Sequence, residues 1–130
     1  MCIKENLSNA VVLMSEPLKG KTPDEVRAYF ADKSEEIYLA EALALTHEKF
    51  VWLEDEVYDY EEGTEEHMKA RKVAREWLDL MQEYETRIYE VLISEGSCKP
   101  GDHGIKVQEI FMNRNGYVNA SGWWIKRKTK

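Results

Sequence analysis

The chain has 130 residues, of which 43% are hydrophobic and 33% are charged, and its formal net charge is −7. This length suits a single domain with one hydrophobic core, and the hydrophobic fraction is too high for a disordered chain. No apolar run approaches the roughly 18 residues needed to span a bilayer, and the apolar run at residues 10–14 is too short for the core of a signal peptide. We therefore expect a cytoplasmic protein that does not enter membranes. Its two cysteines, Cys2 and Cys98, exclude a disulfide framework.

Charge is distributed unevenly along the chain. Residues 34–66 contain 12 acidic residues and a single basic residue, Lys49. The last stretch, residues 110–130, contains five basic residues and no acidic one. Opposed segments of this kind can attract each other within one molecule, orient a homodimer or bind partners of opposite charge, although most charge runs are simply solvated faces.

A short helix is expected over residues 22–33. Thr22 is a candidate N-cap, Pro23 occupies the first helical position, and two acidic residues follow in the first turn. Upstream of this helix, the apolar run at residues 10–14 could form a strand or a docked turn.

Two long helices are expected next, over residues 34–62 and 64–95. Ser34 and Thr64 are candidate N-caps, and Gly96 is a plausible C-terminal glycine. In each helix, apolar and aromatic residues recur at alternating spacings of four and three, which indicates one seam along the helix. The two seams should face each other in an antiparallel hairpin. Their members are Leu39, Leu43, Thr46, Phe50, Leu53, Val57 and Tyr60 in the first helix, and Ala70, Val73, Trp77, Leu80, Tyr84, Ile88 and Val91 in the second.

The predicted helices are too long for a compact chain of this size. They would be roughly 42 and 46 Å long, whereas the expected radius of gyration is roughly 14 Å. The hairpin must therefore protrude or be covered. The first helix is also apolar away from its seam, so other segments or a second copy of the chain should cover it. We expect a homodimer through a face formed by Tyr38, Leu45 and Trp52.

The composition of the C-terminal third differs from that of the two predicted long helices. Residues 105–112 are rich in β-branched and aromatic types, and Asn115-Gly116 is the dipeptide most favoured in tight hairpin turns. We therefore predict a β-hairpin over residues 105–127. A competing interpretation is a short helix over residues 103–113, capped by Asp102.

The expected fold class is mainly α, with a small β component (α+β). Residues 1–130 should form a single domain in which a long antiparallel helical hairpin is joined by a short N-terminal helix and a small C-terminal β-hairpin.

The sequence does not favour an enzyme. In the predicted hairpin, His47 and His67 are separated by roughly 18 Å along the helix axis, so they cannot share a metal ion with each other. No histidine lies at a spacing that predicts a base for a serine or cysteine nucleophile. We therefore predict no catalytic residues, no metal site and no cofactor.

One class of enzyme is an alternative interpretation of this sequence. All-helical nucleotide pyrophosphohydrolases bind magnesium through Glu-x-x-Glu on one helix and Glu-x-x-Asp on another. Residues 76–79 match the second pattern, but the nearby Glu-x-x-Glu at residues 62–65 straddles Gly63 and cannot present two carboxylates from one helical face. A metal-dependent nucleotide hydrolase is thus an alternative interpretation for which the sequence offers one of the two patterns.

The end of the predicted hairpin is strongly acidic, and we call it the acidic tip. Trp52, Tyr58 and Tyr60 are interleaved with its acids. Clustered carboxylates repel one another, so the tip lowers stability unless cations or a basic partner neutralise it. The candidate partner-binding residues are Glu54, Asp55, Glu56, Asp59, Glu61, Glu62, Glu65 and Glu66.

The C-terminus is a second candidate surface, which we call the basic tail. Aromatic and basic groups together suit single-stranded nucleic acid or an acidic protein surface. Adjacent residues on a strand point to opposite faces, so at least one of the two tryptophans is expected in the core. The residues of the basic tail are Tyr117, Trp123, Trp124, Arg127 and Lys128.

Together these patterns predict a non-enzymatic protein–protein interaction protein whose acidic tip binds a basic partner. In its sharpest form the chain is an inhibitor that imitates the phosphates of a nucleic acid and occupies the groove of a nucleic-acid-binding protein, as an anti-CRISPR-like inhibitor would. The first alternative is nucleic-acid binding through the basic tail, and the second is the metal-dependent hydrolase.

Overall fold

The structure is a computed structural model that describes residues 20–120 and 122–127. Its elements follow in the order α2 (Pro23–Ala31), α3 (Glu36–Val57), α4 (Glu65–Ser94), α5 (Ile105–Arg114), β1 (Tyr117–Ala120) and β2 (Trp123–Lys126). The fold is mainly α with a small C-terminal β-hairpin, as the sequence predicted. The apolar run at residues 10–14 lies outside the described residues. None of the helices in the described part is long and apolar enough to cross a membrane.

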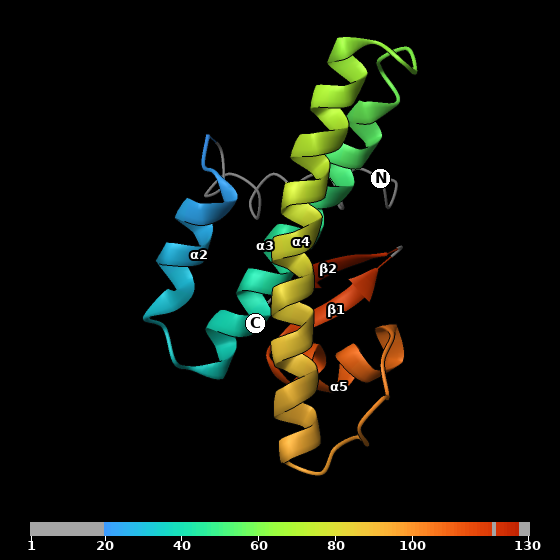
Figure 1. The fold of residues 1–130 in the computed structure, drawn as a ribbon. Coiled ribbons are helices and arrows are strands. Elements are labelled where there is room, and N and C mark those ends of the chain that lie inside the picture. Colours follow the sequence, from blue (N-terminus) through green and yellow to red (C-terminus); the bar gives the residue numbers. More distant parts are fainter. Residues whose placement is uncertain (1–19, 121, 128–130) are drawn as a thin grey trace.

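The helices α3 and α4 form the antiparallel hairpin that dominates the molecule (Figure 1). Helix α2 packs on one side of this hairpin, and α5 and the β-hairpin pack on the other. The end where α3 finishes and α4 begins extends beyond all other elements, as the green part of Figure 1 shows. The hairpin therefore protrudes, and the acidic tip is its free end.

The N-termini of α2 and α4 have the predicted caps. The side chain of Thr22 accepts a hydrogen bond from the Glu25 amide at 3.2 Å, and the Glu25 carboxylate accepts one from the Thr22 amide at 2.9 Å. This reciprocal pair is a capping box. At α4, the hydroxyl of Thr64 accepts from the amide of His67 at 3.2 Å. Both residues satisfy backbone donors that a helix start otherwise leaves unpaired.

Helix α4 ends just before Gly96, the glycine predicted to terminate it. Gly96 has a φ of +83°, a conformation that favours glycine. Its amide donates to the carbonyl of Ile93 at 3.1 Å, and the amide of Ser97 donates to the carbonyl of Leu92 at 2.8 Å. These two bonds form a Schellman motif, which satisfies carbonyl groups left over at the helix end.

The first long helix is shorter than predicted. It starts at Glu36, its N-cap residue Glu35 makes no side-chain capping bond, and it ends at Val57 rather than at residue 62. The last turn contains no basic residue. Acidic side chains are unfavourable there because the C-terminal end of a helix carries a partial negative charge. The chain therefore leaves the helix where the acids accumulate, and residues 58–64 connect the two helices.

The predicted β-hairpin over residues 105–127 is wrong in its first part, where the structure agrees with the competing interpretation of a short helix over residues 103–113. This segment is α5, which means that the β-hairpin starts only at Tyr117, and Asn115 and Gly116 turn the chain from α5 into β1. The predicted cap also differs, since the N-cap is Gly104 and the Asp102 carboxylate instead accepts from the amide of Lys99 at 2.8 Å. The helical face explains the outcome. Its buried residues Gln108, Phe111 and Met112 recur at helical spacing, and their burial outweighs the intrinsic β preference of the segment.

The two strands pair antiparallel, with Tyr117 opposite Lys126 and Asn119 opposite Trp124. Directly opposed residues share one face of a sheet. On this face Tyr117 and Trp124 are both buried and belong to the hydrophobic core. The short hairpin thus closes the core against α3 rather than standing apart from it.

Half of the predicted seam residues, seven of 14, are buried, and five more are partly buried. Thr46 is buried as well, and its hydroxyl donates to the carbonyl of Ala42 at 2.7 Å. Two seam residues are exceptions, because Tyr60 remains 38% exposed and Val73 41% exposed, both near the acidic tip. The buried seam members are Leu43, Thr46, Val57, Trp77, Leu80, Tyr84 and Ile88.

Candidate functional site

The structure brings the acidic residues of the tip together on the projecting end of the hairpin. Glu54, Asp55 and Glu56 lie in the last turns of α3, and Glu65 and Glu66 open α4. The remaining three acids lie in the connection between the helices. All eight side chains are exposed.

The charge of the tip is not neutralised within the described part of the chain. Across residues 20–120 and 122–127, no ion pair involves any tip carboxylate, whereas acids elsewhere pair with arginine: Glu83 with Arg27, and Glu36 and Glu95 with Arg114. The nearest run of exposed basic residues starts at Lys69, on the second turn of α4. The tip therefore combines a dense negative charge with full access from solvent.

Exposed apolar side chains concentrate at the same end of the molecule. Of the eight large hydrophobic residues exposed in the described part, five fall between residues 52 and 73. Exposed apolar surface that gathers in one region is typical of a binding surface, whereas isolated exposed residues are ordinary. These five residues are Trp52, Tyr58, Tyr60, Met68 and Val73.

A groove lies between α3 and α4 beside the tip, with a volume of about 350 Å³. Its apolar part comes from both helices and from the connection, and two carboxylates and one ammonium group complete the lining. This groove was not predicted from the sequence. The signal was present, however, because four of the lining residues belong to the predicted seams. The lining consists of Leu53, Glu56, Tyr60, Glu66, Lys69, Ala70 and Val73.

Two aromatic residues of the predicted basic tail are buried in the structure. Tyr117 and Trp124 are each only 3% exposed, so neither ring is available to stack on a base. Burial, with a smaller contribution from the charge of Glu41, raises the pKa of Tyr117 to about 12. Arg127 is exposed. The side chain of Trp123 and all of Lys128 lie outside the described residues.

The predicted dimer face also differs in the structure. Leu45 is 5% exposed and belongs to the core of its own chain, so it does not form part of an outer face. Tyr38 is partly buried, and Trp52 is half exposed. The homodimer itself stays a prediction.

The histidines and cysteines form no metal centre in the part of the chain that the structure describes, where no group of three or more His, Cys, Asp or Glu side chains could hold an ion. His47 is partly buried in α3, and this burial lowers its pKa. The first acidic pair considered for magnesium is divided between two elements, because Glu62 lies in the connection and Glu65 begins α4. In the second pair, Glu76 and Asp79, the carboxylate of Asp79 contacts Arg75 at 3.4 Å.

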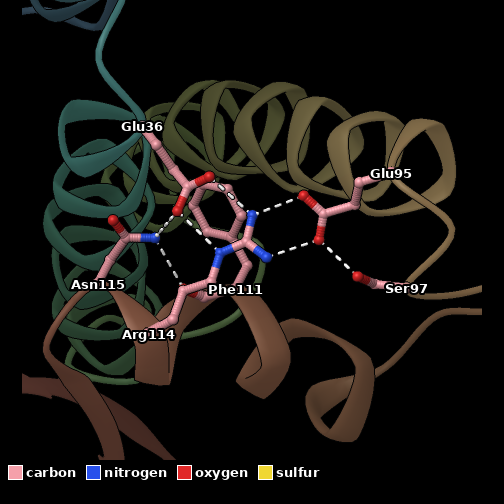
Figure 2. A network of polar contacts seen from close by, with 6 residues as sticks. All are labelled: Glu36, Glu95, Ser97, Phe111, Arg114 and Asn115. Atoms are coloured by element: carbon pink, nitrogen blue, oxygen red, sulfur yellow. Dashed lines mark hydrogen bonds and ion pairs between the residues drawn. The ribbon is translucent and has the colours of Figure 1, made fainter.

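A polar network ties the opposite end of the hairpin together (Figure 2). The guanidinium of Arg114 lies between the carboxylates of Glu36 and Glu95, over the ring of Phe111 at 5.2 Å. Ser97 donates to Glu95 at 2.5 Å. Two carboxylates hold the pKa of Arg114 above its usual value, and Arg114 in turn lowers the pKa of Glu95 to about 2. Because both carboxylates already pair with Arg114 of the same chain, we assign the network to the fold and not to a ligand.

Comparisons with protein-family models, with curated proteins and with solved structures find no match to this chain. Its function therefore has to be inferred from its own surface. The acidic tip with its groove is the candidate site, because charge, exposed apolar surface and a hollow coincide there.

Proposed function

We propose that the chain is a non-enzymatic interaction protein whose acidic tip binds a basic region of another protein. The observation that carries this proposal is that eight exposed carboxylates occupy the projecting end of the hairpin, and that none of them has an ion-pair partner among the described residues. Uncompensated like charges destabilise a folded chain. A partner rich in lysine and arginine removes that repulsion, and the field of the tip accelerates its approach.

The shape of the tip supports the sharper form of the proposal, an inhibitor that imitates nucleic acid. Two packed helices, each about 10–12 Å in diameter with axes about 8–10 Å apart, form a rod that is roughly 20 Å wide in one direction and roughly 10–12 Å in the other. The larger dimension is close to the width of a nucleic-acid duplex. A projecting rod with carboxylates at its end can therefore enter a groove that normally holds phosphates.

The experiment compares the wild-type chain with a variant that lacks half of the tip charge: Glu54→Gln, Asp55→Asn, Glu61→Gln and Glu62→Gln. Both are immobilised and exposed to extract of the source cell, and the retained proteins are identified by mass spectrometry. We expect a basic protein to be retained by the wild type and lost by the variant. A duplex oligonucleotide should release that protein, because the two ligands occupy the same groove. Retention should also weaken steeply with salt.

A matched control removes four exposed acids away from the tip: Glu35→Gln, Glu76→Gln, Asp79→Asn and Glu90→Gln. This control loses the same net charge and should retain the partner. Equal retention by the wild type and the tip variant would overturn the proposal. Release by salt but not by the oligonucleotide would support the acidic tip and overturn the imitation of nucleic acid.

A further inference from the structure

The groove beside the acidic tip is formed where the seam between α3 and α4 stays open. Farther from the tip, seam residues such as Leu43, Trp77 and Leu80 are buried. Near the tip, Val73 remains 41% exposed and Tyr60 38% exposed, although both continue the seam pattern. The wall on α4 consists of residues 66, 69, 70 and 73, whose spacing of three and four places them on one helical face.

The groove lies beside the early end of α3. The sequence pattern continues the first helix through Tyr60, but the helix stops at Val57. Opposite Ala70 and Val73, the groove is lined by Leu53 and Glu56 of α3 and by Tyr60 of the connection. A volume of about 350 Å³ remains. This is at the lower end of the roughly 300–1,000 Å³ that ligand pockets occupy.

Charged residues from both helices border the apolar lining of the groove. Glu56 stands on the α3 side and Glu66 on the α4 side, so a carboxylate borders the groove on each helix. Lys69 is the one basic residue of the lining and lies one turn further from the tip than Glu66. The negative potential is thus strongest toward the tip. An occupant that complements it carries positive charge on that side.

We propose that this groove receives one large apolar side chain from a basic, amphipathic segment of the partner protein, whose lysines and arginines pair with Glu56, Glu66 and the acidic tip. The inference rests on the proposed function and adds the chemistry of the contact. Helices and peptides that lie in grooves bind through such apolar anchors. A buried aromatic or aliphatic side chain usually dominates the affinity, while the surrounding charges guide association.

The apolar anchor has a measurable consequence. Attraction between exposed charges fades with salt, because it is screened beyond about 8 Å at physiological ionic strength. Burial of an apolar side chain is not screened in this way. Binding should therefore keep a component that survives high salt, and this component should depend on the groove.

The test uses two fluorescent synthetic peptides that are rich in lysine and arginine. One has a single central tryptophan, and its twin has serine at that place. We expect the wild-type chain to bind the tryptophan peptide at least about tenfold more tightly than the twin, since a useful anchor contributes a factor of this order. Amide resonances of the isotope-labelled protein should shift at Leu53, Ala70 and Val73.

Two variants alter the groove without changing its charge. Ala70→Leu fills it, and Val73→Ser makes one wall polar at a position exposed enough to tolerate the change. Both should lose the preference for tryptophan while still binding the basic peptides. Met68→Ser is the matched control, because Met68 is 66% exposed at the same end and does not line the groove. It should keep the preference, and thermal unfolding should show that all variants fold.

The tip variant described above separates the two proposals, since none of its four positions lines the groove. It should weaken binding of both peptides and leave their ratio unchanged. Equal affinity of the wild type for the two peptides, no binding of either, or a preference that survives in both groove variants would overturn the groove inference. Peptide binding that is unaffected by the loss of the tip charges would instead count against the proposed function.

Discussion

Arg114 and Glu36 lie 78 positions apart in the sequence, yet the guanidinium donates two hydrogen bonds to the carboxylate, at 2.8 and 2.7 Å. A second pair of bonds, at 2.6 and 2.8 Å, joins Arg114 to Glu95. One side chain of α5 thus holds the start of α3 against the end of α4. The two ends of the hairpin differ accordingly, with paired charges at this end and unpaired carboxylates at the other.

Arg114→Lys should lower the free energy of unfolding by about 1 kcal/mol, because lysine keeps the charge but cannot bridge two carboxylates with a planar fork. Urea unfolding measures the change. Arg75→Lys is the control, since its pair with Asp79 is 3.4 Å long and both side chains are largely exposed. The control should change stability by less than about 0.5 kcal/mol. Equal effects of the two substitutions would contradict the bridging role of Arg114.

Stability should also depend on pH through this network. Hydrogen bonds from Arg114 lower the pKa of Glu36 and lower that of Glu95 from 4.5 to about 2. A carboxyl with a lowered folded-state pKa stabilises the fold above its unfolded pKa, and this contribution is lost as the pH falls through the folded pKa. The difference in melting temperature between wild type and Arg114→Gln should therefore shrink from about pH 5 toward pH 2. A difference that stays constant over this range would show that the bridge does not stabilise the fold.

Trp77→Ala should lower the free energy of unfolding by about 3–5 kcal/mol, because it leaves a large cavity in the seam. Trp77 is 2% exposed, and its ring lies 5.5 Å from the ammonium group of Lys49. Tyr58→Ala provides an aromatic control, as Tyr58 is 81% exposed. It should change stability by no more than about 0.5 kcal/mol. Similar melting temperatures for Trp77→Ala and wild type would refute the packing of the hairpin.

Removal of the hydroxyl should affect stability differently at Tyr84 and at Tyr89, which both lie on α4. The Tyr84 hydroxyl is buried and has no hydrogen-bond partner among the described residues, and burial raises its pKa. The Tyr89 hydroxyl accepts from the amide of Gly104 at 3.1 Å and from Gln108 at 2.7 Å. Tyr84→Phe should leave stability unchanged or raise it by up to about 1 kcal/mol, whereas Tyr89→Phe should cost about 1–3 kcal/mol. Thermal unfolding of both variants measures the difference. A Tyr84→Phe variant less stable than the Tyr89→Phe variant would contradict the prediction.

Local signals accounted for the elements that could be predicted from the sequence. The capping box at Thr22, the cap at Thr64 and the Schellman glycine at Gly96 each depend on contacts within a few residues. The long seam is a periodic pattern that needs only a facing helix to become core. For the same reason the position of the acidic tip at the end of the hairpin could be predicted from the sequence.

The predictions that were wrong concern residues whose structure depends on distant parts of the chain. Residues 105–114 have a mixed local preference, and the burial of Phe111 and Met112 within the fold makes them a helix. Tyr117 and Trp124 were candidates for a binding surface until the pairing of β1 with β2 placed both in the core. Leu45 was assigned to an outer face for a similar reason, since the pattern on α3 does not reveal what covers it.

The sequence by itself determined where α2 and α4 begin, that the two long helices face each other along a seam and where the negative charge accumulates, because caps, periodicity and charge are properties of neighbouring residues. Only the tertiary structure decided that residues 105–114 form a helix, that Arg114 joins both long helices, and that the seam opens into a groove beside Val73. These outcomes come from competition between segments that are far apart along the chain. The energy of each segment depends on what packs against it, and no local pattern contains that information.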